Sequence, residues 1–111
     1  MIPIEHYVVL SALLFVIGGV GFLVRRNVLT QLMSIEVMLN AENMALIAFN
    51  RTHPEHRAIA AYGGASHTGQ VFAFFIIAAE AAEVAVGLAI VLALYRLRRT
   101  VRSDEADLLR N

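Results

Sequence analysis

The amino-acid sequence predicts an all-helical membrane protein with three transmembrane helices, and three observations lead to this fold class. Of the 111 residues, 59% are hydrophobic and only 16% are charged, against about a half and about a quarter in an ordinary soluble domain. The apolar residues fall into three blocks, with most charges between them. Each block is long enough to cross the ~30 Å hydrocarbon core of a bilayer. Residues 1–111 should therefore form a single integral membrane subunit.

The first predicted span covers about residues 4–24. No charged residue lies between Glu5 and Arg25. The motif Gly18-Gly19-Val20-Gly21 would allow close approach of another helix, and local flexibility is the alternative interpretation. A cleaved secretory signal begins with a basic region, whereas this chain begins Met-Ile-Pro-Ile-Glu-His. We therefore expect the first span to be retained.

The second predicted span covers about residues 28–49 and follows a very short turn at Arg25-Arg26-Asn27. It is the most polar of the three blocks, so a soluble amphipathic helix is the competing interpretation. A span is favoured because it brings both arginine-rich segments to one side of the membrane.

The loop at residues 50–70 follows the second span and contains His53, His56 and His67. These histidines suggest a metal site, but no cysteine or carboxylate cluster accompanies them. We expect a solvated loop and no bound metal.

The third predicted span covers about residues 71–95, and residues 96–111 form a tail that we expect to be an exposed segment or a short helix. Arginines gather in the first turn and just after the third span. Positive residues prefer the cytoplasmic side of a membrane. The N-terminus and the long loop are therefore expected outside, and the C-terminus in the cytoplasm.

Four carboxylates lie within the predicted spans, at Glu36, Glu42, Glu80 and Glu83, and no span contains Lys or Arg. A charged residue near the bilayer centre costs about 2.5–3.5 kcal/mol on insertion scales, and such residues usually mark ion or proton paths. The alternative is that they are protonated, or paired with another subunit, for structural reasons alone. The zero net charge makes nucleic acid an unsuitable partner.

The spacing of these acids along a helix predicts which side chains share a face. Glu36, Asn40 and Asn43 share one face, so the amides are placed to donate to the carboxylate, whereas Glu42 points elsewhere. Glu80 and Glu83 are three residues apart and repel by roughly 3 kcal/mol at an effective dielectric near 20. We expect at least one of this pair to be neutral. Gly87 leaves room for a neighbouring helix or water.

Several stretches together resemble the NuoK subunit of bacterial respiratory complex I, the counterpart of the mitochondrial 4L subunit. They are the N-terminal Met-Ile-Pro-Ile-Glu-His, the turn Arg25-Arg26-Asn27, Ser34-Ile35-Glu36-Val37-Met38-Leu39-Asn40-Ala41, Gly69-Gln70-Val71, and Ala81-Ala82-Glu83-Val84-Ala85-Val86-Gly87-Leu88-Ala89. The resemblance covers about residues 1–99. It implies a multi-pass subunit in the bacterial inner membrane, within the membrane arm of proton-pumping NADH:quinone oxidoreductase.

The resemblance also implies roles and partners. Glu36 and Glu83 would be the acids used for proton translocation. The helical spacing and like charge of Glu80 and Glu83, and not the resemblance, lead us to expect that Glu80 mainly tunes Glu83. NuoJ and the antiporter-like NuoN would be neighbours, with NuoA and NuoH nearby. This chain offers no cofactor or metal ligands and no nucleophile with a base, so it would not catalyse redox chemistry alone. The FMN, iron–sulfur clusters and quinone would belong to other subunits.

Glu42, Glu80 and the length of the 50–70 loop depart from the family pattern. The family's function is not carried over to Glu42 and Glu80, which, with Asn40 and Asn43, are additional candidates only. Three competing interpretations remain: a small subunit of sodium/proton antiporters, a purely structural assembly subunit, and a small drug exporter. Glu36 and Glu83 argue against the first, and three spans instead of four argue against the third.

Overall fold

Three long antiparallel helices make up most of the computed structural model, which describes residues 2–52 and 68–106. Helix α1 covers Ile4–Val24, α2 covers Val28–Asn50 and α4 covers Thr68–Arg98. A short 3-10 helix, η1, covers Ser103–Glu105. All three long helices are long and apolar enough to cross a membrane. The predicted fold class is therefore confirmed, and the chain is a multi-pass membrane protein.

The helix bounds agree closely with the predicted spans. The first two differ from prediction by at most one residue, whereas α4 extends the predicted 71–95 span at both ends. Two arginines, Arg96 and Arg98, lie in its last turn, where positive charge is favoured by the helix dipole.

The three loop histidines, for which a metal site was considered, lie outside the described residues. Within the described ranges no group of His, Asp or Glu could hold a metal ion.

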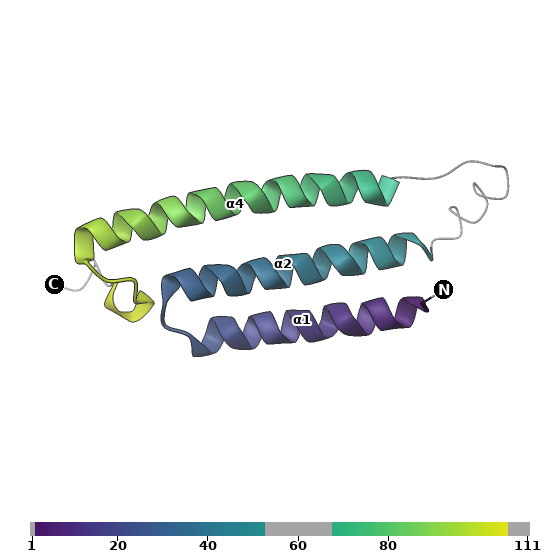
Figure 1. The fold of residues 1–111 in the computed structure, drawn as a ribbon, viewed down its shortest axis with the longest axis horizontal. Helices are drawn as coiled ribbons and strands as arrows, with labels where there is room; N and C mark the ends of the chain where they lie inside the picture. Colours follow the sequence, from purple (N-terminus) through teal and green to yellow (C-terminus); the bar gives the residue numbers. More distant parts are fainter. Residues whose placement is uncertain (1, 53–67, 107–111) are drawn as a thin grey trace.

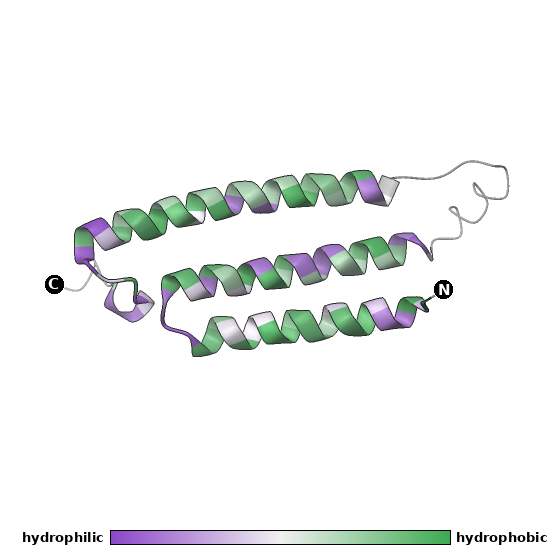
Figure 2. Ribbon diagram, viewed as in Figure 1, coloured by the Kyte–Doolittle hydropathy of each residue, from purple (hydrophilic) through white to green (hydrophobic). Residues whose placement is uncertain are grey.

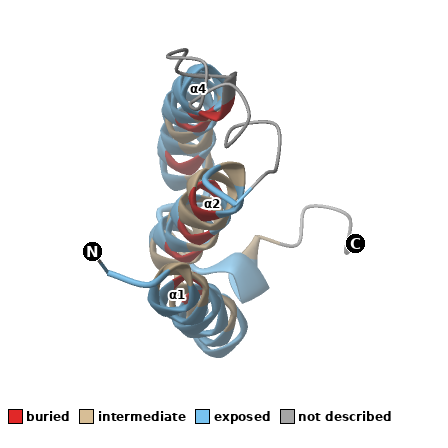
Figure 3. Ribbon diagram, turned by 90° about the vertical axis from the view of Figure 1, so that its right-hand side faces the viewer, coloured by how far each residue is buried: buried red, intermediate tan, exposed pale blue. Residues whose placement is uncertain are grey.

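Helix α2 lies between α1 and α4 and packs against both (Figures 1 and 3). The chain's N-terminus, the end of α2 and the start of α4 lie at one end of the molecule, which we call the N-terminal end. The α1–α2 turn and the end of α4 lie at the other, the arginine end. Both arginine-rich segments therefore share one end, as expected. Which side of the membrane this end faces remains a prediction.

Small residues line the α1–α2 interface. Ser34, Ala41 and Ala48 are buried and recur every seven residues along α2, the spacing of helices that pack along a continuous seam. Gly18 is buried against α2, where an added Cβ would lie 2.6 Å from Met38 Cγ and 2.8 Å from the Ser34 carbonyl oxygen. Close approach, the first of the two interpretations of these glycines, therefore holds at Gly18.

Two glycines set the register between α2 and α4. Gly69 contacts the side chain of Asn50, and an added Cβ at Gly87 would lie 2.6 Å from Leu32 Cδ1. The expected room beside Gly87 is thus occupied by α2. Gly69 and Gly87 are eighteen residues apart on α4, and their partners Asn50 and Leu32 are eighteen residues apart on α2. Equal separations are what two antiparallel helices of the same rise per residue require. In this register Glu83 is about level with Glu36.

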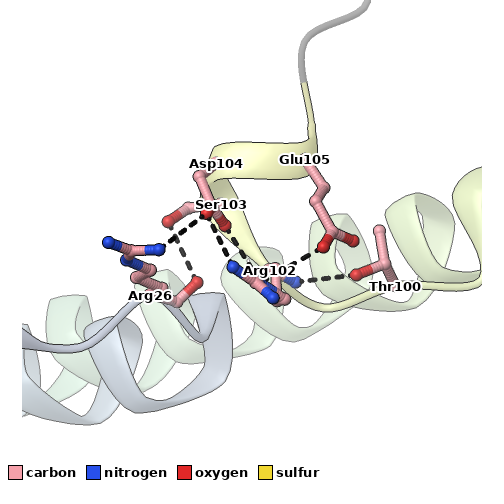
Figure 4. Close-up of polar contacts among 6 residues, drawn as sticks. All are labelled: Arg26, Thr100, Arg102, Ser103, Asp104 and Glu105. Atoms are coloured by element: carbon pink, nitrogen blue, oxygen red, sulfur yellow. Dashed lines mark hydrogen bonds and ion pairs between the residues drawn. The ribbon is translucent and has the colours of Figure 1, made fainter.

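The segment after α4 folds back onto the α1–α2 turn (Figure 4). The Val28 amide donates to the Val101 carbonyl at 2.8 Å, and the Ser103 amide donates to the Arg26 carbonyl at 2.7 Å. Asp104 pairs with Arg102 at 2.9 Å and with Arg26 at 3.5 Å. We call this set of contacts the arginine clip. It ties the exposed tail, predicted to be a short helix or an exposed segment, to the first turn.

The Gly18 contact predicts a position-specific effect of adding one methyl group. Gly18→Ala should destabilise the α1–α2 pair by about 1–3 kcal/mol, because the new Cβ meets backbone as well as the Met38 side chain. Gly19→Ala is the matched control, since nothing lies within 4 Å of its added Cβ. Thermal unfolding of the purified protein, or of the assembly containing it, measures the difference. Equal melting temperatures in the two variants would contradict the packing described here.

The clip predicts a pH dependence of the tail contact. A side-chain hydrogen bond from Arg102 is the main cause that lowers the pKa of Asp104, and desolvation opposes it. A carboxyl with a lowered folded-state pKa stabilises the fold above its ordinary pKa, and this stabilisation is lost as the pH falls through the lowered value. Asp104→Asn should therefore remove the contribution even at neutral pH. Hydrogen exchange at the Ser103 amide should rise a few-fold at most, since the pair is exposed. Glu5→Gln, at the opposite end, is the control, and an unchanged Ser103 exchange rate in Asp104→Asn would refute the contribution.

Candidate functional site

Polar residues lie at mid-length of α2 and α4, among hydrophobic turns (Figure 2). All four predicted intramembrane acids are on these helices: Glu36 and Glu42 on α2, Glu80 and Glu83 on α4. Their exposure differs. Glu80 is only 5% exposed, Glu36 is half-buried, and Glu42 and Glu83 are exposed on the surface of this chain. In a membrane, the last two would face lipid or another protein.

Glu80 faces α2. The buried residues of α4 on either side of it, Ala73 and Val91, and the half-buried Gly87 belong to the same face. Glu80 lies eleven residues after Gly69, and Leu39 lies eleven before Asn50, so the two are about level in the observed register. Glu36 lies three residues before Leu39 and four after Leu32, whose side chain meets Gly87 of α4, so the half-buried Glu36 is also near this interface. The two helices therefore place Glu36 and Glu80 within about one helical turn of each other in depth.

The side chain of Asn40 does not act as the sequence suggested. The Asn40 side chain donates to the Glu36 main-chain carbonyl at 2.9 Å, not to a carboxylate, because an amide four residues along a helix reaches that carbonyl first. Asn40 itself is exposed, whereas Asn43 is buried. Within the described part of the chain, the buried atoms Asn43 Oδ1 and Glu80 Oε1 have no hydrogen-bond partner.

A groove of about 330 Å³ lies beside Asn43 and runs to the N-terminal end of the molecule. Tyr7 of α1 lines it, together with Asn40, Asn43 and Arg51, the residue that follows α2; the rest of the lining is apolar. Two of its polar residues, Asn40 and Asn43, come from the same face of α2 as Glu36. The groove thus leads from the N-terminal end toward the level of the acids.

The burial of Glu80 was not identified from sequence, although a signal was present. Ala73 and Gly87 lie seven residues before and after it, and small residues at this spacing mark a packed helix face. The arginine clip was also missed, because backbone pairing between segments far apart in the chain leaves no local pattern.

The fold and these acids define a class: a small multi-pass membrane protein with titratable carboxyl groups inside its spans and no Lys or Arg in residues 28–50 or 68–95. The chain belongs to the family of NADH-ubiquinone/plastoquinone oxidoreductase chain 4L, whose model matches residues 6–111. The predicted family is therefore confirmed.

Three relatives illustrate the similarity. The NADH-quinone oxidoreductase subunit K of Sorangium cellulosum is 59% identical over 110 residues, covering 99% of this chain and 97% of that protein. Subunit K of Acidobacterium capsulatum is 44% identical over 110 residues, covering 99% of both chains. Subunit K 1 of Koribacter versatilis is 49% identical over 105 residues, covering 95% of this chain and 92% of that one.

Proposed function

We propose that the chain is a membrane-arm subunit of proton-pumping NADH:quinone oxidoreductase and that Glu36 and Glu83 take part in proton translocation. The family assignment and the subunit K relatives support the place in the complex. Glu36 and Glu83 lie at about the same depth on neighbouring helices, and residues 28–50 and 68–95 contain no Lys or Arg; both observations support the proton role. This equal depth is the observation that carries the proposal.

The chemistry proposed for this chain is proton binding and release. Glu36 is half-buried beside α4, and Glu83 is exposed on the surface of α4. In this proposal the proton moves laterally, from Glu36 inside this subunit to Glu83, which would meet a neighbouring subunit. FMN, iron–sulfur clusters and the quinone site belong, in this proposal, to other subunits, and NuoJ, NuoN, NuoA and NuoH are the proposed neighbours in the bacterial inner membrane.

The family assignment favours this function over a small drug exporter or an antiporter subunit. The remaining competitor is a purely structural assembly subunit in which the acids are not used. Substitution of the acids in the assembled complex separates the two.

Glu36→Gln and Glu83→Gln should each lower NADH-driven proton uptake by about tenfold or more, because an amide cannot release a proton. Glu42→Gln is the matched control on α2. Glu42 is exposed and six residues from Glu36, on a different face. Proton uptake is measured in membranes, with complex assembly checked by co-purification of NADH dehydrogenase activity and flavin. Full uptake in both assembled Glu36→Gln and Glu83→Gln would support the structural alternative, and a greater loss in Glu42→Gln than in Glu36→Gln would reverse the ranking.

The arginine end is proposed to face the cytoplasm. The sequence contains no cysteine, so Thr52→Cys and Ala106→Cys each introduce a single label site, one at each end. A membrane-impermeant maleimide should label Thr52→Cys from outside and Ala106→Cys from the cytoplasmic side. The reverse pattern would refute the orientation without affecting the family assignment.

A further inference from the structure

We propose that Glu80 is a further proton-binding group, which connects the level of Glu36 and Glu83 to the N-terminal end of the subunit through water held at Asn43. This rests on the proposed function, since it extends the path of the same protons. The sequence alone assigned Glu80 a tuning role beside Glu83. Its position between α2 and α4 supports a direct one.

The first support is a pair of buried acceptors. Glu80 and Asn43 are 5% and 6% exposed, and in the described residues neither Glu80 Oε1 nor Asn43 Oδ1 receives a hydrogen bond. A buried acceptor without a donor is costly. One water held between the two would donate to both oxygens, and a neutral Glu80 would add a donor of its own.

The second support is the order of depths along the α2–α4 interface. Glu80 lies three residues nearer the N-terminal end than Glu83, which is about 4.5 Å along a helix axis. Asn43 lies four residues beyond Leu39, which is level with Glu80, and this adds about 6 Å. Glu83, Glu80 and Asn43 therefore lie at successive depths, each nearer the N-terminal end and the groove.

The third support is the groove itself. Its volume of about 330 Å³ exceeds the ~30 Å³ that one water occupies in the liquid. Asn43 lies in its wall, and so does Arg51, which directly follows the end of α2. Water in this groove would bring protons as far as Asn43, one step from Glu80.

A carboxyl group buried inside a membrane-spanning helix, with no cation beside it, can take part in proton transfer in its neutral form. Glu80 fits this description, since residues 28–50 and 68–95 contain no Lys or Arg. A neutral acid transfers a proton in a balanced step: one oxygen accepts a proton from one side while the other releases its proton to the opposite side. Glu80 is neutral before and after the step.

The test uses the assembled complex with Glu80→Gln, Glu80→Asp and Asn43→Leu, and with Glu42→Gln as the control. Glu80→Gln and Asn43→Leu should each lower NADH-driven proton uptake by about tenfold or more. Glu80→Asp, which keeps a carboxyl group, should retain most of the uptake. The carbonyl band of a protonated carboxylic acid in the infrared spectrum should disappear in Glu80→Gln and shift in Glu80→Asp. It should stay unchanged in Glu42→Gln.

Full uptake in Glu80→Gln, with only the pH profile moved, would leave Glu80 a tuning role and overturn the proposal. Full uptake in Asn43→Leu would also overturn it, because the link through water at Asn43 would be unnecessary. Should Glu80→Gln fail to assemble, an unshifted carbonyl band in Glu80→Asp would refute it instead. Failure of the proposed function looks different: uptake would then survive in Glu36→Gln and Glu83→Gln as well.

Discussion

Close packing of α2 against both neighbours is the constraint on which the rest of the structure depends. Inside a bilayer, lipid solvates apolar side chains as well as protein does, so helices associate through tight van der Waals contact and small residues. Gly18 brings α1 to the backbone of α2, and Gly69 and Gly87 bring α4 to its other side. These three contacts fix how far each helix can slide along its neighbour.

The depth of every acid follows from this register. With Gly87 against Leu32, Glu83 becomes level with Glu36, and Glu80 becomes level with a point between Glu36 and Asn43. A shift of α4 by one turn, about 5.4 Å, would separate Glu36 from Glu83 in depth and move Glu80 to a different part of α2. The glycine contacts therefore determine the depth at which each carboxyl group lies. The arginine clip adds a second restraint at the far end, where Val28 and Val101 are joined through the backbone.

The fold was largely predictable from sequence because membrane spans are set by length and hydropathy, which are local properties. The bounds of α1 and α2 were predicted to within about one residue for this reason. The presence of Glu36 and Glu83 in spans followed in the same way. Which acid is buried could not be deduced from the pair Glu80 and Glu83 alone, since a three-residue separation does not say which of the two meets α2. That depends on the contact of Gly87 with Leu32, a feature of tertiary packing. Asn40 was misassigned for a related reason: its own backbone offers a nearer acceptor than the Glu36 carboxylate.

The acids differ in how far this chain's own helices cover them. Glu80 and Asn43 are enclosed by this chain's own helices, so their hydrogen-bonding needs must be met from within or by water that enters along the groove. Glu83 is exposed on α4, and an ionisable group on a transmembrane surface is tolerated only where protein or water covers it. Protein or water from outside this chain must therefore cover Glu83, whereas the chain's own helices already cover Glu80. The proposed proton path thus has one part that the chain builds alone and one part that forms only in the assembly, and the two meet at the level of Glu36.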